Sequence, residues 1–253
     1  MNNNYKTFIV AFLLFFTEGR VVAQTRFKAT ALAGINFSQI GGDKQEGYRQ
    51  RGVSLGLGGS LYLRPDIEIG TELLYNVKGA KPNTEIPANG LGFDNNYFST
   101  FSLAYSEIAL FSNFHLSPNF EKKYYKRSFL VGLSYGRLLK SSTSIIKYNT
   151  RLTAFETAVS SQYNPHDFSF ILGLAQMVTP KIGISIRHTL SINYLYKNPS
   201  YKFVFGNTNA GFEHLKPFFL SFHLFYNFIS PNKVLGLYVK KNTPNKNPLE
   251  ELY

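Results

Sequence analysis

Apolar residues recur at every second position in eight separate runs of this chain. In the first run, the odd-numbered positions from Phe27 to Phe37 are all apolar, and most of the even-numbered ones are polar or glycine. Successive side chains of a β-strand point to opposite faces, so each run predicts a strand with one apolar and one polar face. The eight predicted strands are 27–37, 53–63, 67–77, 105–116, 128–139, 168–178, 182–196 and 218–228.

The connections between these strands alternate in length. The second, fourth and sixth strands end at tight turns such as Arg64-Pro65-Asp66, whereas the other connections are longer. Short turns at one end and long loops at the other are typical of bacterial outer-membrane barrels. We therefore predict an all-β fold, an eight-stranded antiparallel up-and-down transmembrane β-barrel over 24–229. Residues 143–161 could supply two further strands, but this segment is polar on both faces, which favours eight strands over ten.

The alternation alone does not say which face points inward. A soluble eight-stranded barrel of the lipocalin type, with its apolar face inside, is the main alternative. Composition favours a barrel whose apolar outer face contacts lipid, since aromatic residues reach 16% and charged residues only 17%, against a usual charged share of about 25%. The mean hydropathy of −0.13 is compatible with a membrane barrel, because polar lumen positions offset apolar lipid-facing ones.

The N-terminal segment predicts export. Lys6 precedes an apolar run over 8–16, and Val21-Val22-Ala23 supplies small residues before Gln24, as in a cleaved signal peptide. We therefore predict a signal peptide at 1–23, the cell outer membrane as destination, and a periplasmic tail at 230–253. The chain has no cysteine, which excludes disulfides, thiolate metal sites and a lipid-modified cysteine.

Charged residues fall on the predicted inner face. An eight-stranded barrel is just wide enough for side chains to fill its interior. Unpaired charges in so dry a space would cost several kcal/mol each. We therefore predict an internal ion-pair network that holds the barrel closed, with a gated ion path as the alternative. Its members are Lys28, Glu68, Glu72, Glu107 and Arg187.

The sequence offers little catalytic chemistry. His188 and Ser191 invite comparison with lipid A deacylases, but residues three apart on a strand face opposite sides. His115 and His223 are expected to point into the lumen as hydrogen-bonded residues. Zinc-binding spacings and phosphate-binding glycine loops are not found in the sequence. We predict no catalytic residue, no cofactor and no metal site, and a lipid A-modifying hydrolase is the less favoured alternative.

Several of these strands resemble a known family. Residues 30–40 (TALAGINFSQI), 52–59, 69–79 and 105–110 are similar to the PorT-like outer-membrane β-barrel proteins of Bacteroidetes-type bacteria. The resemblance covers 24–229, and Ala109 stands where the family usually has proline. It implies an outer-membrane barrel, and the founding member's association with type IX secretion implies, as an alternative function, a role in a secretion or gliding apparatus.

The formal net charge of +12 bears on the expected partners. Basic residues gather at the predicted periplasmic turns, above all at 121–127. We expect contacts with outer-membrane lipids and lipopolysaccharide, with the barrel-insertion machinery, and with a periplasmic or secretion-system protein, but not with nucleic acid. The favoured function is a non-enzymatic structural or interaction role in the envelope, ahead of a component of a secretion apparatus.

Overall fold

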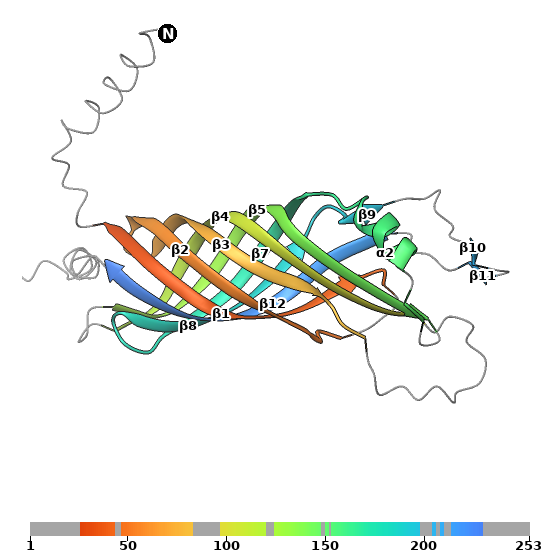
Figure 1. Cartoon of the computed structure of the whole chain (residues 1–253). Coiled ribbons are helices and arrows are strands. Elements are labelled where there is room, and N and C mark those ends of the chain that lie inside the picture. Colours follow the sequence, from red (N-terminus) through yellow and green to blue (C-terminus); the bar gives the residue numbers. More distant parts are fainter. Residues whose placement is uncertain are drawn as a thin grey trace, which may run out of the picture.

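A long antiparallel sheet closes on itself in the computed structural model of the chain (Figure 1). Each long strand pairs antiparallel with the next, and β1 pairs with β12 to complete the ring. The predicted eight-stranded antiparallel barrel is confirmed. The long strands are β1 (Phe27–Gly41), β2 (Gln50–Arg64), β3 (Ile67–Ala80), β4 (Tyr97–Asn119), β5 (Tyr124–Lys147), β7 (His166–Met177), β8 (Ile182–Ser191) and β12 (His214–Ile229). The structure describes residues 26–43, 47–82, 97–119, 124–147, 150–151, 153–197, 204–205, 208–209 and 214–229.

Shorter elements occupy the long connections. The helix α2 lies in the segment that could have supplied two further strands, so the ten-stranded alternative is wrong. Ala154, Glu156 and Ala158 favour a helix there, and the segment lacks the two-residue alternation of the wall strands. The short elements are β6 (Thr150–Arg151), α2 (Thr153–Ser160), β9 (Tyr196–Lys197), β10 (Val204–Phe205) and β11 (Thr208–Asn209).

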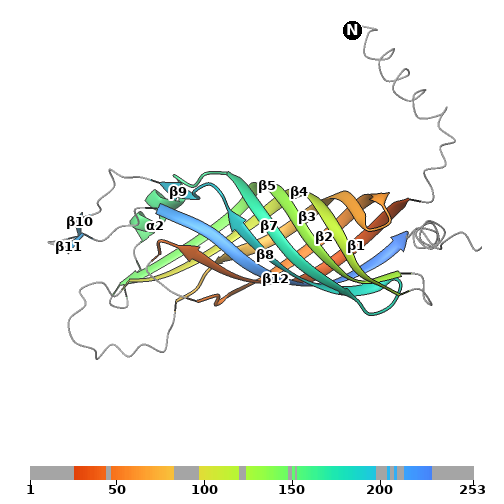
Figure 2. The same cartoon turned by 180° about the vertical axis from the view of Figure 1, so that it is seen from behind.

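The two ends of the barrel differ, as Figures 1 and 2 show. The start of β1, the end of β12 and the short connections β2–β3, β4–β5 and β7–β8 share one end, which we call the turn end. The helix α2 and β9 lie at the opposite end, which we call the loop end. The predicted alternation of short and long connections is therefore confirmed. At the loop end, residues 97–100 of β4 pair with 144–147 of β5, beyond Ala80 at the end of β3.

The apolar faces of the strands point outward. Leu57 is 62% exposed and Ile184 50% exposed on the outside, whereas Glu72 is 4% and Arg187 8% exposed inside. A soluble barrel with its apolar face inside is therefore excluded. The apolar wall fits a hydrocarbon surrounding, and the closed ring gives backbone groups of the wall strands partners within the sheet.

Glycines in the wall strands allow neighbouring strands to approach closely. A Cβ atom at Gly34 would lie 2.1 Å from the carbonyl oxygen of Phe222, and one at Gly79 would lie 1.9 Å from that of Phe101. Both separations are too short for any side chain. Glycine is therefore required where β1 meets β12 and where β3 meets β4.

The predicted signal peptide at 1–23 and the predicted tail at 230–253 lie outside the described residues. Within the described ranges, no helix has both the length and the apolar character needed to cross a membrane.

Candidate functional site

The lumen holds four of the seven acidic side chains that the structure describes: Glu68, Glu72, Glu107 and Asp167. Of the residues predicted for the internal network, Glu68, Glu72, Glu107 and Arg187 are buried and Lys28 is half-buried. The period of two explains this placement, because their register on β1, β3, β4 and β8 directs them away from the apolar wall. They form three separate groups along the barrel.

The group nearest the turn end centres on Glu68. Its Oε1 lies 2.5 Å from Nζ of Lys28, and its Oε2 lies 2.8 Å from Nε2 of His115. The His115 ring stacks between Tyr62 and Tyr125, with ring centroids 5.2 Å away on both sides. The fully buried carboxylate is thus held by a cation and an imidazole that is itself fixed by packing.

The middle group is one two-pronged ion pair. The guanidinium of Arg187 donates from Nη1 to Glu72 Oε2 at 2.5 Å and from Nη2 to Oε1 at 3.0 Å. Glu72 lies on β3 and Arg187 on β8, which are separated by three strands in either direction around the ring. The pair therefore spans the lumen and ties opposite walls together.

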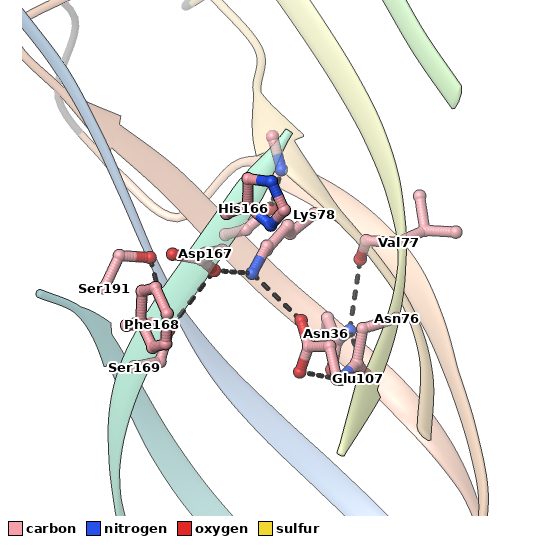
Figure 3. A network of polar contacts seen from close by, with 12 residues as sticks. Asn36, Asn76, Val77, Lys78, Glu107, His166, Asp167, Phe168, Ser169 and Ser191 are labelled. Carbon is pink, nitrogen blue, oxygen red and sulfur yellow. Dashed lines mark hydrogen bonds and ion pairs between the residues drawn. The ribbon is translucent and has the colours of Figure 1, made fainter. Parts of the chain in front are cut away.

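The group nearest the loop end centres on Lys78 (Figure 3). Its ammonium lies 3.0 Å from Glu107 Oε1 and 2.5 Å from Asp167 Oδ2, and the side chain is fully buried. Asn76 donates to the other oxygen of Glu107 at 2.8 Å, and Asn36 donates to Asn76 at 3.1 Å. A single cation thus serves two carboxylates from β4 and β7, and the amides satisfy the remaining oxygen of Glu107.

The sequence did not identify every member of these groups. The structure pairs Lys28 with Glu68 and Glu72 with Arg187, but Glu107 meets Lys78, which was not among the predicted members. Asp167 was also missed. The period of two could have found both, because Lys78 shares the parity of Glu72 and Asp167 precedes the outward Phe168.

Apolar side chains close the lumen at the loop end. Phe101, Leu103, Ile145 and Leu215 are fully buried there and pack with Val159 of α2. The cluster joins the charged lumen directly, since Tyr105, another member, places its ring 4.2 Å from the ammonium of Lys78. We call this cluster the loop-end plug; its full membership is Ile40, Ala80, Phe101, Leu103, Tyr105, Ile145, Val159, Tyr163, Leu195, Tyr196 and Leu215.

Glu156 anchors α2 over the plug. Its Oε1 accepts hydrogen bonds from the backbone N–H of Ile145 at 2.8 Å and from Nε of Arg151 at 2.9 Å. Burial acts to raise the pKa of this carboxyl, but these two hydrogen bonds outweigh it and hold the pKa below the usual value. The carboxylate therefore favours the docked helix at neutral pH, and this contribution is lost as the pH falls through the lowered pKa.

A cavity of about 90 Å³ occupies the other half of the lumen. It reaches from the Glu72–Arg187 pair to Tyr124 and Pro180 near the turn end, and its lining mixes polar side chains with apolar ones such as Leu130 and Phe225. Its size and the polar groups in its lining suit a few water molecules. The interior is thus open to hydration toward the turn end and packed with apolar side chains at the loop end.

The histidines do not assemble the hydrolytic site considered from sequence. His188 faces outward and bonds Tyr48 at 3.0 Å, whereas Ser191 points inward and bonds Ser169. A different serine, Ser54, lies 2.8 Å from Nε2 of His223. Both residues are buried, the opposite ring nitrogen of His223 has no hydrogen-bond partner, and neither residue lines the cavity. That pair lacks the orienting third group and the access to substrate that a nucleophile and base require.

A closed eight-stranded barrel with an apolar outer wall and a charged interior defines an integral outer-membrane barrel protein. The profile of the outer membrane protein beta-barrel domain family matches residues 22–197, and the chain belongs to this family. No curated protein sequence matches it.

Solved outer-membrane barrels resemble the chain at low sequence identity. The attachment invasion locus protein Ail of Yersinia pestis is 9% identical, with 80% of this chain and 99% of that one covered and a TM-score of 0.40. Neisserial surface protein A is 12% identical, with 80% and 97% covered and a TM-score of 0.38. The N-terminal β-barrel domain of Pseudomonas aeruginosa OprF is 8% identical, with 79% and 97% covered and a TM-score of 0.32.

The Lys78 group predicts a strong effect on stability. Lys78→Met leaves Glu107 and Asp167 buried without their cation, and we expect the free energy of unfolding to fall by about 3–5 kcal/mol. Urea titration of the protein refolded in phospholipid vesicles measures the change. The matched control replaces the carboxylates too (Lys78→Met with Glu107→Gln and Asp167→Asn) and should regain a large part of the loss. Wild-type stability of Lys78→Met alone would contradict this account.

Proposed function

We propose that this protein is a non-enzymatic integral outer-membrane barrel with a structural and interaction role in the envelope. The observation that carries the proposal is the closed lumen, with ion pairs across its middle and the loop-end plug at one mouth. An interior so filled is suited to holding the wall rigid, and the surfaces left for function are the two ends and the outer wall.

The geometry of the lumen supports this role over diffusion. In an eight-stranded ring, the side chains of opposite walls meet, as Glu72 and Arg187 do. A solute passing through would have to separate this pair and displace Phe101 and Leu215 of the plug, both fully buried. The outward placement of His188 and the inward placement of Ser191 support the absence of lipid hydrolysis.

Electrical recordings test the sealed lumen. The full chain, refolded and inserted into planar bilayers, should give no steady channel current under conditions in which a general porin conducts. Phe101→Ala with Leu215→Ala should raise ion leak, because both truncations open the plug. Leu110→Ala with Leu133→Ala removes comparable volume from the exposed outer wall and should leave the leak at the wild-type level. A stable conductance in the wild-type protein would refute the proposal.

A second candidate function is a part in a protein-secretion apparatus of the PorT-like kind. Two observations favour it: the resemblance over 30–116, and a set of exposed basic side chains at the turn end. Arg26, Lys126, Arg127 and Lys181 are all exposed there, on the side predicted to face the periplasm. Such a surface suits an acidic periplasmic partner.

A deletion strain distinguishes this second candidate. Loss of the gene should block export of secreted proteins in the native bacterium, and the wild-type chain should restore it. Arg26→Gln with Lys126→Gln and Lys181→Gln should restore it poorly, because the basic surface is removed while the barrel is kept. Normal secretion in the deletion strain would exclude this function and leave the first proposal standing.

A further inference from the structure

The outer wall changes character at the loop end. On β5 outward Leu133 and Tyr135 are followed by Arg137, and exposed Leu139 and Lys140 lie beyond it. On β12 the outward positions run from Phe222 and Phe218 to Lys216. The same change from apolar to basic occurs on β2, where the outward position next to Val53 on the loop-end side is Arg51. Outward side chains next to an apolar belt lie at the level of lipid headgroups, so these strands mark the boundary of the membrane.

Contacts on this wall join several strands into one surface. Arg137 of β5 donates from Nη1 to Nε2 of His166 on β7 at 2.9 Å. Asn193, which follows β8, donates to the carbonyl of His166 at 2.7 Å, and the next residue, Tyr194, is exposed. The ammonium groups of Lys197 and Lys216 lie 5.5 and 5.9 Å from the ring centroid of Tyr194. His214 packs against the same ring at 5.4 Å. We call the surface formed by Arg137, His166, Tyr194, Lys197, His214 and Lys216 the outer-rim patch.

The cations of this patch have no exposed acidic neighbour among the described residues, since Asp43, which follows the Gly41–Lys216 pair, is buried. Arg137, Lys197 and Lys216 form no ion pair with a described carboxylate. Every described aspartate and glutamate is buried except Asp66, which lies in the β2–β3 turn at the opposite end. In the described part of the chain, the exposed charge at the loop end is therefore entirely basic. An anionic ligand on this wall would meet Lys197 and Lys216 beside Tyr194, and Arg137 two strands away beside His166.

We propose that the outer-rim patch binds the phosphate groups of a phosphorylated glycolipid of the lipid A type in the outer leaflet. The ligand must be anionic to match Arg137, Lys197 and Lys216, and guanidinium and ammonium groups bind phosphate well. It must also be amphiphilic, because the patch adjoins lipid-facing Tyr135, Phe168 and Ile192 on the barrel wall. A soluble polyanion would gain nothing from that apolar side.

This assignment depends on the place of the barrel in the outer membrane and is independent of whether the lumen is sealed. Bound lipid would tie the mobile outer leaflet to β5, β7, β8 and β12 through the loop-end side of the wall. The cation–aromatic contacts of Tyr194 hold Lys197 and Lys216 near the headgroup level, which reduces the entropy lost on binding.

Native mass spectrometry of the full chain in nanodiscs tests the proposal. The nanodiscs contain phosphatidylcholine with either bisphosphorylated lipid A or its dephosphorylated form. The patch variant is Arg137→Gln with Lys197→Gln and Lys216→Gln. The matched control, Arg26→Gln with Lys126→Gln and Lys181→Gln, removes the same charges from exposed positions at the turn end.

We expect the wild-type chain and the turn-end control to retain bisphosphorylated lipid A equally, and the patch variant to retain it at least about tenfold less, given the usual gain per cation near a charged lipid surface. Dephosphorylated lipid A should be retained weakly by all three, and added salt should reduce the wild-type preference. Heat-modifiable gel mobility establishes that each variant is folded. If the triple variant does not fold, Lys197→Gln with Lys216→Gln gives the same comparison with a smaller loss.

Three results would overturn the assignment. Equal retention of bisphosphorylated lipid A by the patch variant and the wild type would show that the patch is not the binding site. Equal retention of the bisphosphorylated and dephosphorylated lipids by the wild type would show that phosphate is not recognised. Binding of a soluble sulfated polysaccharide that depends on the patch, without any patch-dependent lipid A retention, would identify a soluble polyanion as the ligand instead.

Discussion

Closure between β1 and β12 is the constraint on which the structure depends. A sheet surrounded by hydrocarbon cannot leave an edge unpaired, because each lone backbone group there would cost several kcal/mol. The pairing of Ala29 with Ile229 through Gly41 with Lys216 removes that edge. Once the ring is closed and the apolar face meets lipid, every second side chain must enter a narrow interior. Charges on those positions must then find partners across it, as Glu72 and Arg187 do.

The period of two made most of the fold predictable. Strand number, the order of short and long connections and the inward placement of Glu68 and Glu107 all follow from parity and turn residues. Pairing across the lumen could not be read in the same way, since it depends on which strands of the ring face each other and at what height. Lys78 and Asp167 show this, because they are 89 positions apart in the chain. The helix α2 was missed because eight residues give only a short local signal. Tertiary contacts hold it in place: Glu156 accepts a hydrogen bond from the backbone of β5, and Val159 enters the plug.

The two halves of the barrel differ in what fills their interiors. The loop-end half is packed inside by the plug and carries basic side chains on its outer wall. The turn-end half keeps a partly polar cavity inside and a basic rim outside, and the contacts among Lys28, Glu68 and His115 tie its strands together. The two ends thus both carry exposed basic side chains and differ mainly in how their interiors are filled.

The central claim is that the apolar faces of the strands meet lipid. Because the chain has no cysteine, single substitutions along β2 can each carry a nitroxide spin label in the protein reconstituted in bilayers. Collision with dissolved oxygen, which concentrates in hydrocarbon, should be frequent for labels at Leu55, Leu57 and Leu61 and rare for labels at Ser54 and Ser60. Oxygen contact that is equal at all five positions, or greatest at the two serines, would contradict the account.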